Sequence, residues 1–141
     1  MIQEFDTLTD SQVSDVLALM RELTSGIAVT REMLERAVSA PGTHFFAAVD
    51  SAGRILGCAS LCVYDSPTGR KASVEDVVVG SAARGQGLGR ALMEHIIAFA
   101  REELAPVDLH LTSRPQRVAA NELYRSLGFE KRETNAYLLR I

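Results

Sequence analysis

The segment that decides the fold of this chain runs from Val74 to Arg90 and reads Val-Glu-Asp-Val-Val-Val-Gly-Ser-Ala-Ala-Arg-Gly-Gln-Gly-Leu-Gly-Arg. Three consecutive valines, Val77 to Val79, predict the end of a strand that is buried on both faces in the middle of a sheet. A glycine-rich turn follows them, and apolar residues then repeat at helical spacing from Leu88 to about Leu104. The segment therefore predicts a central strand, a tight turn and a long helix.

A turn of this kind suits an anionic ligand. The N-terminus of a helix presents unpaired N–H groups and the positive end of its dipole, and glycines let the backbone approach a ligand closely. We therefore expect a phosphate or a pyrophosphate at the turn. The alternative is a flexible connection whose glycines serve tight packing.

Two common phosphate-binding patterns are absent from the turn. The P-loop pattern Gly-x4-Gly-Lys-Ser/Thr occurs nowhere in the chain. The dinucleotide pattern Gly-x-Gly-x-x-Gly also fails, because the glycines fall at positions 85, 87 and 89 and Arg90 follows them. The turn also follows the fourth expected strand, whereas the dinucleotide pattern follows the opening strand of a βαβ unit.

Hydrophobic spacing on either side of the segment predicts a mixed order of strands and helices. Thr9 and Gln12 stand at capping-box spacing before a first helix, Thr30 can cap a second, and Gly128 ends the last. The expected strands are 2–5, 44–49, 54–64, 72–79 and 107–111, with one or two closing strands in 129–141, and the expected helices are 10–24, 31–40, 88–104 and 115–127. This order predicts an α/β (α+β mixed) fold with a mixed sheet.

Length and composition exclude several classes of protein. The 141 residues fit one domain, 1–141, and 47% hydrophobic with 23% charged residues is typical of a globular chain. A net charge of −3 argues against nucleic acid as a partner. Apolar runs fall far short of the roughly 20 residues that a membrane span needs, and the acidic N-terminus does not resemble a signal peptide, so we expect no membrane association.

Two further counts bear on location and ligands. Cys58 and Cys62 lie four residues apart on one expected strand, too far apart to form a disulfide, which favours free thiols and a cytoplasmic location. Residues 1–50 hold eight acidic and three basic residues, whereas residues 51–141 hold ten acidic and twelve basic ones. An anionic ligand is therefore favoured on the later part of the chain and a cationic one on the first. No cluster of Cys, His and Asp has zinc spacing, so no metal is expected.

Two motifs carry a resemblance to a known family. The string Arg84-x-x-Gly87-x-Gly89 resembles the acetyl-CoA signature of the GNAT (GCN5-related) N-acetyltransferase superfamily. About 35 residues later, Asn121-x-x-Tyr124-x-x-x-Gly128-Phe129 resembles a second segment of the same family. The resemblance implies a mostly antiparallel, mixed sheet of six to seven strands, splayed between strands 4 and 5 and flanked by about four helices.

The resemblance also implies which residues bind acetyl-CoA. In the family, backbone amides of the signature loop hold the pyrophosphate, which by match are those of Arg84, Gly85, Gln86, Gly87, Leu88 and Gly89, with Arg90 just inside the helix. The pantetheine arm pairs with the end of the preceding strand, here Val77, Val78 and Val79, often beside a bulge, where that strand splays from 107–111. The Val79 N–H is a candidate for stabilising the oxyanion.

The resemblance further assigns candidate catalytic residues. Tyr124 matches the acid that protonates the departing CoA thiolate, and Asn121, one helical turn earlier, matches a residue that binds the CoA arm. Glu75 is the first candidate for the base that takes a proton from the amine, directly or through water, with Asp76 as the alternative. His110, on the strand that faces the splay, is a minor candidate.

The implied reaction is transfer of acetyl from acetyl-CoA to a primary amine by direct attack, without a covalent acyl-enzyme. Because the chain is short, we expect a small-molecule amine as the acceptor. Acetylation of protein N-termini or lysines is the alternative within this class, and a non-catalytic module that binds acyl-CoA is the alternative outside it. Dimers are common in the family, and a homodimer through the closing strands is a further expectation.

Overall fold

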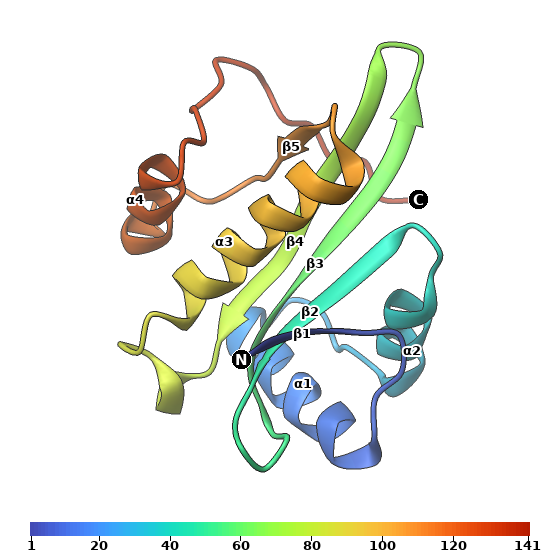
Figure 1. The fold of residues 1–141 in the computed structure, drawn as a ribbon, viewed down its shortest axis with the longest axis vertical. Coiled ribbons are helices and arrows are strands. Elements are labelled where there is room, and N and C mark those ends of the chain that lie inside the picture. Colours follow the sequence, from blue (N-terminus) through green and yellow to red (C-terminus); the bar gives the residue numbers. More distant parts are fainter. The chain divides into compact units, whose positions relative to one another are not determined.

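The computed structural model describes residues 1–141 (Figure 1). The chain forms two compact units, 1–111 and 112–141. The first unit contains β1 (Ile2–Phe5), α1 (Asp10–Leu23), α2 (Arg31–Ser39), β2 (Thr43–Val49), β3 (Ile55–Ser66), β4 (Gly69–Val79), the 3₁₀ turn η1 (Ser81–Ala83), α3 (Leu88–Phe99), the π-helical turn η2 (Ala100–Leu104) and β5 (Asp108–His110). The second unit contains α4 (Val118–Ser126).

The five strands of the first unit form one mixed sheet in the order β1-β2-β3-β4-β5. The first four strands pair antiparallel, and β5 alone runs parallel to its neighbour β4. The expectation of a mixed, mostly antiparallel sheet is therefore confirmed.

Helices of the first unit cover both faces of this sheet. Side chains of α1 and α2 share a buried cluster with Phe45, Ala47, Cys58 and Val78, which lie on one face. The ring of Phe46 points the other way, because side chains alternate along a strand, and it packs against Phe99 of α3 with ring centroids 5.3 Å apart. Figure 1 shows α3 lying across strands β3 and β4.

The predicted start of α1 is confirmed in atomic detail. The Thr9 hydroxyl accepts the Gln12 N–H at 3.3 Å, and the Gln12 side chain accepts the Thr9 N–H at 3.0 Å. This is the capping box that the spacing of the two residues predicted. Thr30 likewise caps α2 by accepting the Met33 N–H at 3.2 Å.

The strand count differs from the expectation of six to seven. Residues 129–141, where one or two closing strands were expected, form no strand in the structure. The run from Glu130 to Asn135 is polar throughout and lacks the alternation of apolar residues that gives a half-buried strand its stability. The last helix also begins later than expected, at Val118, with residues 115 and 116 in a turn before it.

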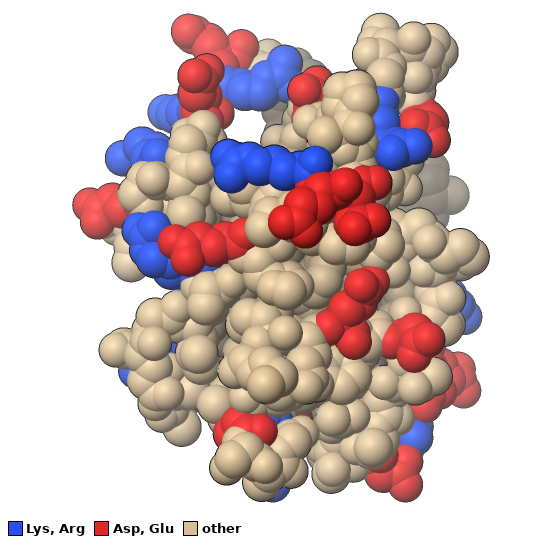
Figure 2. All heavy atoms as spheres, viewed as in Figure 1, with Lys and Arg blue, Asp and Glu red and all other residues tan.

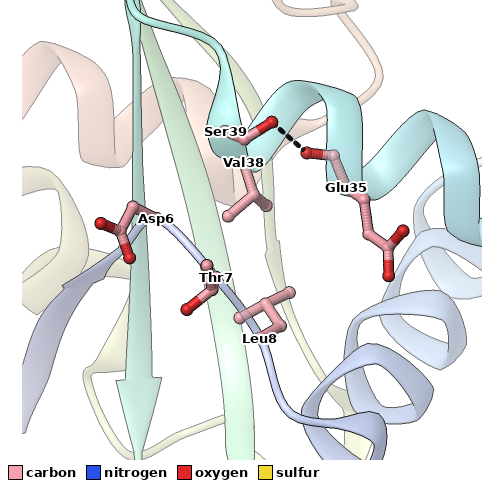
Figure 3. Close-up of a pocket in the computed structure, with 6 residues that line it drawn as sticks. All are labelled: Asp6, Thr7, Leu8, Glu35, Val38 and Ser39. Atoms are coloured by element: carbon pink, nitrogen blue, oxygen red, sulfur yellow. Dashed lines mark hydrogen bonds between the residues drawn. The ribbon is translucent and has the colours of Figure 1, made fainter.

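Acidic side chains predominate over the part of the surface that β1, α1 and α2 form, as the charges of residues 1–50 predicted (Figure 2). A hollow of about 300 Å³ lies there, between the β1–α1 connection and α2. Leu8 and Val38 face one another across it, and Ser39 bonds back to the Glu35 carbonyl at 2.8 Å (Figure 3). No residue of the predicted site lines this hollow. No helix in the structure has both the length and the apolar character needed to cross a bilayer.

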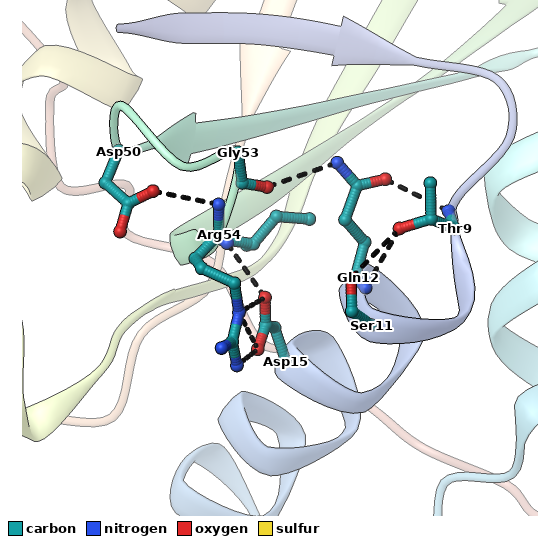
Figure 4. A network of polar contacts seen from close by, with 8 residues as sticks. Thr9, Ser11, Gln12, Asp15, Asp50, Gly53 and Arg54 are labelled. Atoms are coloured by element: carbon teal, nitrogen blue, oxygen red, sulfur yellow. Dashed lines mark hydrogen bonds and ion pairs between the residues drawn. The ribbon is translucent and has the colours of Figure 1, made fainter.

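One polar network joins α1 to the turn between β2 and β3 (Figure 4). The Asp15 carboxylate, whose side chain is 8% exposed, accepts bonds from the Arg54 guanidinium and from the Ile55 N–H at 3.0 Å. The bond from Arg54 is the main reason that the pKa of Asp15 lies below its ordinary value. Asp50 holds the same turn by accepting the Arg54 N–H at 2.9 Å.

We predict that Asp15→Ala lowers the free energy of unfolding by about 1–2 kcal/mol at pH 7, because the Ile55 N–H loses its acceptor. Since the Asp15 pKa is lowered on folding, its contribution is complete above the unfolded value of about 3.9 and disappears as pH falls through the folded value. Urea unfolding at pH 7 and at pH 3 measures both effects. Asp10→Ala, which removes a side chain that is 88% exposed, is the matched control and should change stability little. A difference between Asp15→Ala and wild type that persists unchanged at pH 3 contradicts the assignment.

Candidate functional site

Strand β4 contains a bulge at Asp76 and Val77, directly before its last two residues, Val78 and Val79. Val78 pairs with Cys58 and Glu75 pairs with Ser60, so that Asp76 and Val77 together oppose Ala59 alone. Asp76 adopts a left-handed backbone with φ of 52°, which aspartate tolerates better than most residues. Bulges redirect side chains and interrupt pairing, and they are frequent beside active sites. A bulge was expected at this place, and the structure contains it.

The same strand separates from β5 shortly after the two strands meet. Only Lys71, Ala72 and Ser73 of β4 pair with β5, and their partners are Asp108 to His110. Beyond Ser73 the β5 side of β4 has no neighbouring strand in the sheet. This is the splay between the fourth and fifth strands that was expected.

Backbone alternation determines which groups face this splay. The Gly80 N–H donates to the Leu56 carbonyl of β3 at 2.9 Å, on the β3 side of the strand. Successive residues of a strand direct their N–H and C=O groups to opposite sides, so Val78 also points toward β3 and Val79 points away from it. The Val79 N–H and C=O therefore face the splay, which is the direction that the oxyanion assignment requires.

The glycine turn after β4 has the geometry of an anion site. Gly85 and Gly87 have φ of 82° and 75°, values that residues with a Cβ rarely adopt. Gly87 is the N-cap of α3, and the first helical hydrogen bond runs from the Ala91 N–H to the Gly87 carbonyl at 3.0 Å. The N–H groups of Leu88 and Gly89, which precede the first helical bond, consequently have no acceptor within the helix. They point out of the helix N-terminus, where the dipole favours a negative charge.

Arg84 connects this turn to the end of β4. Its Nε donates to the Val79 carbonyl at 3.3 Å, so that the carbonyl facing the splay has a partner while the adjacent N–H remains available. The predicted binding residues of the turn and of the strand end are thus brought together within the first unit. Arg90 lies just inside α3, and its guanidinium forms an ion pair with the Glu94 carboxylate at 3.4 Å.

The candidate bases lie next to the bulge. The Ser73 hydroxyl donates to Glu75 Oε1 at 2.5 Å, which holds that carboxylate above the strand. Partial burial raises the pKa of Asp76, and the nearby charge of Glu75 raises it further. His110 is the register partner of Ser73 on β5. The contact between Ser73 and Glu75 was not predicted, although the spacing i, i+2 on one strand face could have indicated it.

Asn121 and Tyr124 lie in the second unit, where their motif also has a local structural role. The Asn121 side chain donates to the Arg114 carbonyl at 3.0 Å and so closes the turn before α4. At the other end, Gly128 has φ of 99°, and the Phe129 N–H returns to the Tyr124 carbonyl at 3.0 Å. This is a Schellman motif, and Tyr124 packs edge-on against Phe129 with ring centroids 6.2 Å apart. The confirmed helix stop at Gly128 places Tyr124 in the last turn of α4.

The sequence that forms this strand end and turn also matches known proteins. A family model described as the acetyltransferase (GNAT) family matches residues 13–129. The chain belongs to the GNAT acetyltransferase family. The matched residues include the glycine turn, the bulged strand and α4, so that both motifs lie inside the family region.

Three curated relatives illustrate the range of GNAT proteins that the chain resembles. N-acetyltransferase 8 of Rattus norvegicus is 37% identical over 92 residues, which are 64% of this chain and 40% of that protein. Streptothricin acetyltransferase of Streptomyces lavendulae is 36% identical over 60% of this chain and 43% of that protein. N-alpha-acetyltransferase RimI of Mycobacterium tuberculosis is 30% identical over 68% of this chain and 58% of that protein. The chain thus spans about two fifths of the length of the first of these relatives.

A solved GNAT structure supports the fold along the whole chain. A putative acetyltransferase from Agrobacterium tumefaciens str. C58 superposes with a TM-score of 0.83, covering 99% of both chains at 22% identity. At this identity the likeness shows the fold alone. The mixed sheet of the first unit, with helices on both faces, therefore has the fold of this solved structure.

The two cysteines should differ sharply in reactivity. Burial raises the pKa of the Cys58 thiol to about 12, with a further contribution from Asp76, whereas Cys62 is only partly buried. Because the thiolate is the reactive form, we predict that a disulfide reagent at pH 8 labels at most one thiol per folded chain, and that this thiol is Cys62. Labelling of both thiols is expected only after denaturation. Rapid labelling of Cys58 in the folded protein would contradict its buried, protonated state.

Proposed function

We propose that this GNAT chain transfers the acetyl group of acetyl-CoA to a primary amine of a small molecule, by direct attack in a ternary complex. The observation that carries the proposal is the end of β4, which has no strand on its β5 side and where the outward Val79 N–H adjoins the turn formed by Gly85, Gly87 and the N-terminus of α3. A pyrophosphate and a chain of two amides are the ligand groups that such a turn and strand edge complement.

The binding roles follow from these groups. The backbone N–H groups from Arg84 to Gly89 would hold the pyrophosphate, with Arg90 just inside the helix, and the strand end from Val77 to Val79 would pair with the pantetheine arm. The Val79 N–H would donate to the thioester oxygen as negative charge develops on it. Asn121 can contribute its side-chain oxygen or its second N–H to the arm, because only one N–H of its NH₂ group is bonded to the Arg114 carbonyl.

The proton transfers need one base and one acid. An alkylammonium with a pKa of about 10.4 is almost entirely protonated at pH 7, so it must lose a proton before its nitrogen can attack the acetyl carbon. Glu75, held by Ser73, is the proposed base, and Asp76 is the second candidate because its raised pKa brings it closer to the working pH. As the C–S bond breaks, the CoA thiolate takes a proton from the Tyr124 hydroxyl, and the second proton that the attacking nitrogen loses on becoming an amide restores the phenol. Cys58, buried and protonated, does not suit an acyl carrier.

Charge and relatives both bear on the acceptor. The surplus of acidic residues over 1–50 favours a cationic amine near α1 and α2. One relative is named for streptothricin and another for N-alpha acetylation, so both a small molecule and a protein N-terminus are acceptors among proteins that resemble this chain. Acetylation of protein N-termini or lysines is therefore the second candidate function, and a non-catalytic acyl-CoA-binding module is the third.

The first test combines ligand binding with an acceptor screen. We expect CoA at about 100 times its Kd to stabilise the chain by about 2.7 kcal/mol, which should raise the melting temperature by several degrees. ATP and NAD at the same concentration serve as controls for general phosphate binding. Release of free thiol from acetyl-CoA then reports transfer to a panel of small amines and of peptides with free N-termini or lysines. Absence of stabilisation by millimolar CoA contradicts the proposal.

A pair of variants separates catalysis from binding in the same assay. Tyr124→Phe should lower kcat about 100-fold while leaving the CoA-induced shift in melting temperature in place, because only the proton donor is lost. Tyr64→Phe, on β3, changes a tyrosine outside the motifs and should leave kcat unchanged. Equal kcat values for Tyr124→Phe and wild type on every accepted amine would show that Tyr124 is not the acid.

A further inference from the structure

The last turn of α1 is bonded directly to the start of the glycine turn. The Glu22 carboxylate accepts the Ser81 N–H with both oxygens, at 3.0 and 3.4 Å, although 59 residues separate the two in sequence. Gly80, just before, allows this approach, because a Cβ there would lie 3.1 Å from the Leu19 side chain and 3.3 Å from the Leu56 carbonyl. The contact is therefore built into the packing of α1 against the end of β4.

The same carboxylate is electrostatically linked to Arg84. Hydrogen bonding by Ser81 lowers the pKa of Glu22, and the charge of Arg84 lowers it further, so Glu22 is ionised at neutral pH. Arg84 in turn donates to the Val79 carbonyl at 3.3 Å. Glu22 is thus bonded to the first residue of η1, and the charge that acts on it belongs to Arg84, which bonds the strand edge that faces the splay.

The centre of the turn has no comparable support. A Cβ built on Gly85 or Gly87 would meet no atom within 4 Å, so these residues are held by their backbone geometry and not by packing. Glycine has more backbone freedom than any other residue. The shape of the turn therefore depends on how its two ends are fixed. Helix α3 fixes the later end, and the bond between Glu22 and Ser81 fixes the earlier end.

We propose that Glu22 is a positioning residue for acetyl-CoA, which acts through the Ser81 N–H to hold the glycine turn in the conformation that receives the pyrophosphate. The inference rests on the proposed function. A carboxylate beside a pyrophosphate site repels the ligand, so any gain in affinity from Glu22 must come from preorganisation of the turn. The oxygen that accepts the Ser81 N–H is thus the essential feature of the side chain, and its charge is not.

Three variants isolate this role. Glu22→Ala removes both the acceptor and the charge, whereas Glu22→Gln keeps an acceptor oxygen without the charge. Ser81→Pro removes the N–H and leaves the carboxylate. Proline fits there, because Ser81 is the first residue of a helical turn and the preceding Gly80 has φ of −58° and ψ of 144°. Glu35→Ala removes an exposed carboxylate paired with Arg31 on α2 and is the matched control.

The readout compares two ligands that differ in the pyrophosphate. Calorimetry gives the Kd of CoA, and a titration followed by NMR gives the Kd of pantetheine, which lacks the pyrophosphate and the nucleotide. We expect Glu22→Ala and Ser81→Pro to raise the Kd of CoA about fivefold to tenfold and to change that of pantetheine less than twofold. Glu22→Gln and Glu35→Ala should keep the Kd of CoA within about threefold of wild type.

The outcomes distinguish this inference from the proposed function. If Glu22→Ala weakens both ligands equally, the residue is merely structural and the inference is wrong. If Glu22→Ala affects neither ligand, or Glu22→Gln is as impaired as Glu22→Ala, the route through the Ser81 N–H is refuted while CoA binding by wild type still supports the proposed function. If wild type itself binds no CoA, the proposed function and the inference are refuted together.

Discussion

The candidate site depends on the incomplete pairing of one strand. Strand β4 has a partner on both sides over Lys71 to Ser73 and a partner on one side only from there to Val79. A backbone edge inside a sheet is unstable without hydrogen-bond partners, and here that edge lies directly before a helix N-terminus. The Val79 N–H and the N–H groups at the start of α3 are therefore donors from adjacent segments of the chain, and a ligand with amides and phosphates could satisfy both sets.

The bulge in β4 carries local backbone strain at Asp76. A left-handed backbone at a residue other than glycine, as at Asp76, costs of order 1 to 3 kcal/mol and persists only where the surroundings hold it. The surroundings here are the pairing of Val78 with Cys58 on one side of the bulge and of Glu75 with Ser60 on the other. The burial of Cys58 that gives its thiol a high pKa is part of the same support.

Much of the fold could be predicted from the sequence, and the exceptions have physical reasons. The capping box of α1 and the stop at Gly128 depend on residues close in sequence, so their spacing was sufficient. The mixed sheet was predicted from the order of strands and helices and its splay from the family resemblance, and both are confirmed. The strands expected over 129–141 are absent. The apolar residues near the C-terminus suggested them, but the polar run before those residues lacks the alternation that stabilises a strand. The bond between Glu22 and Ser81 joins residues 59 positions apart and left no local signal.

Hydrogen exchange of the Val79 amide tests the central claim most directly, because that N–H faces the splay whereas the neighbouring Val78 N–H faces β3. In the free protein, Val79 should exchange much faster than Val78. Saturating acetyl-CoA should slow the exchange of Val79 at least tenfold, together with that of Leu88 and Gly89, and should leave the exchange rate of Val78 nearly unchanged. Bound acetyl-CoA with no protection of the Val79 amide would contradict the account of β4 as the strand edge that receives the ligand.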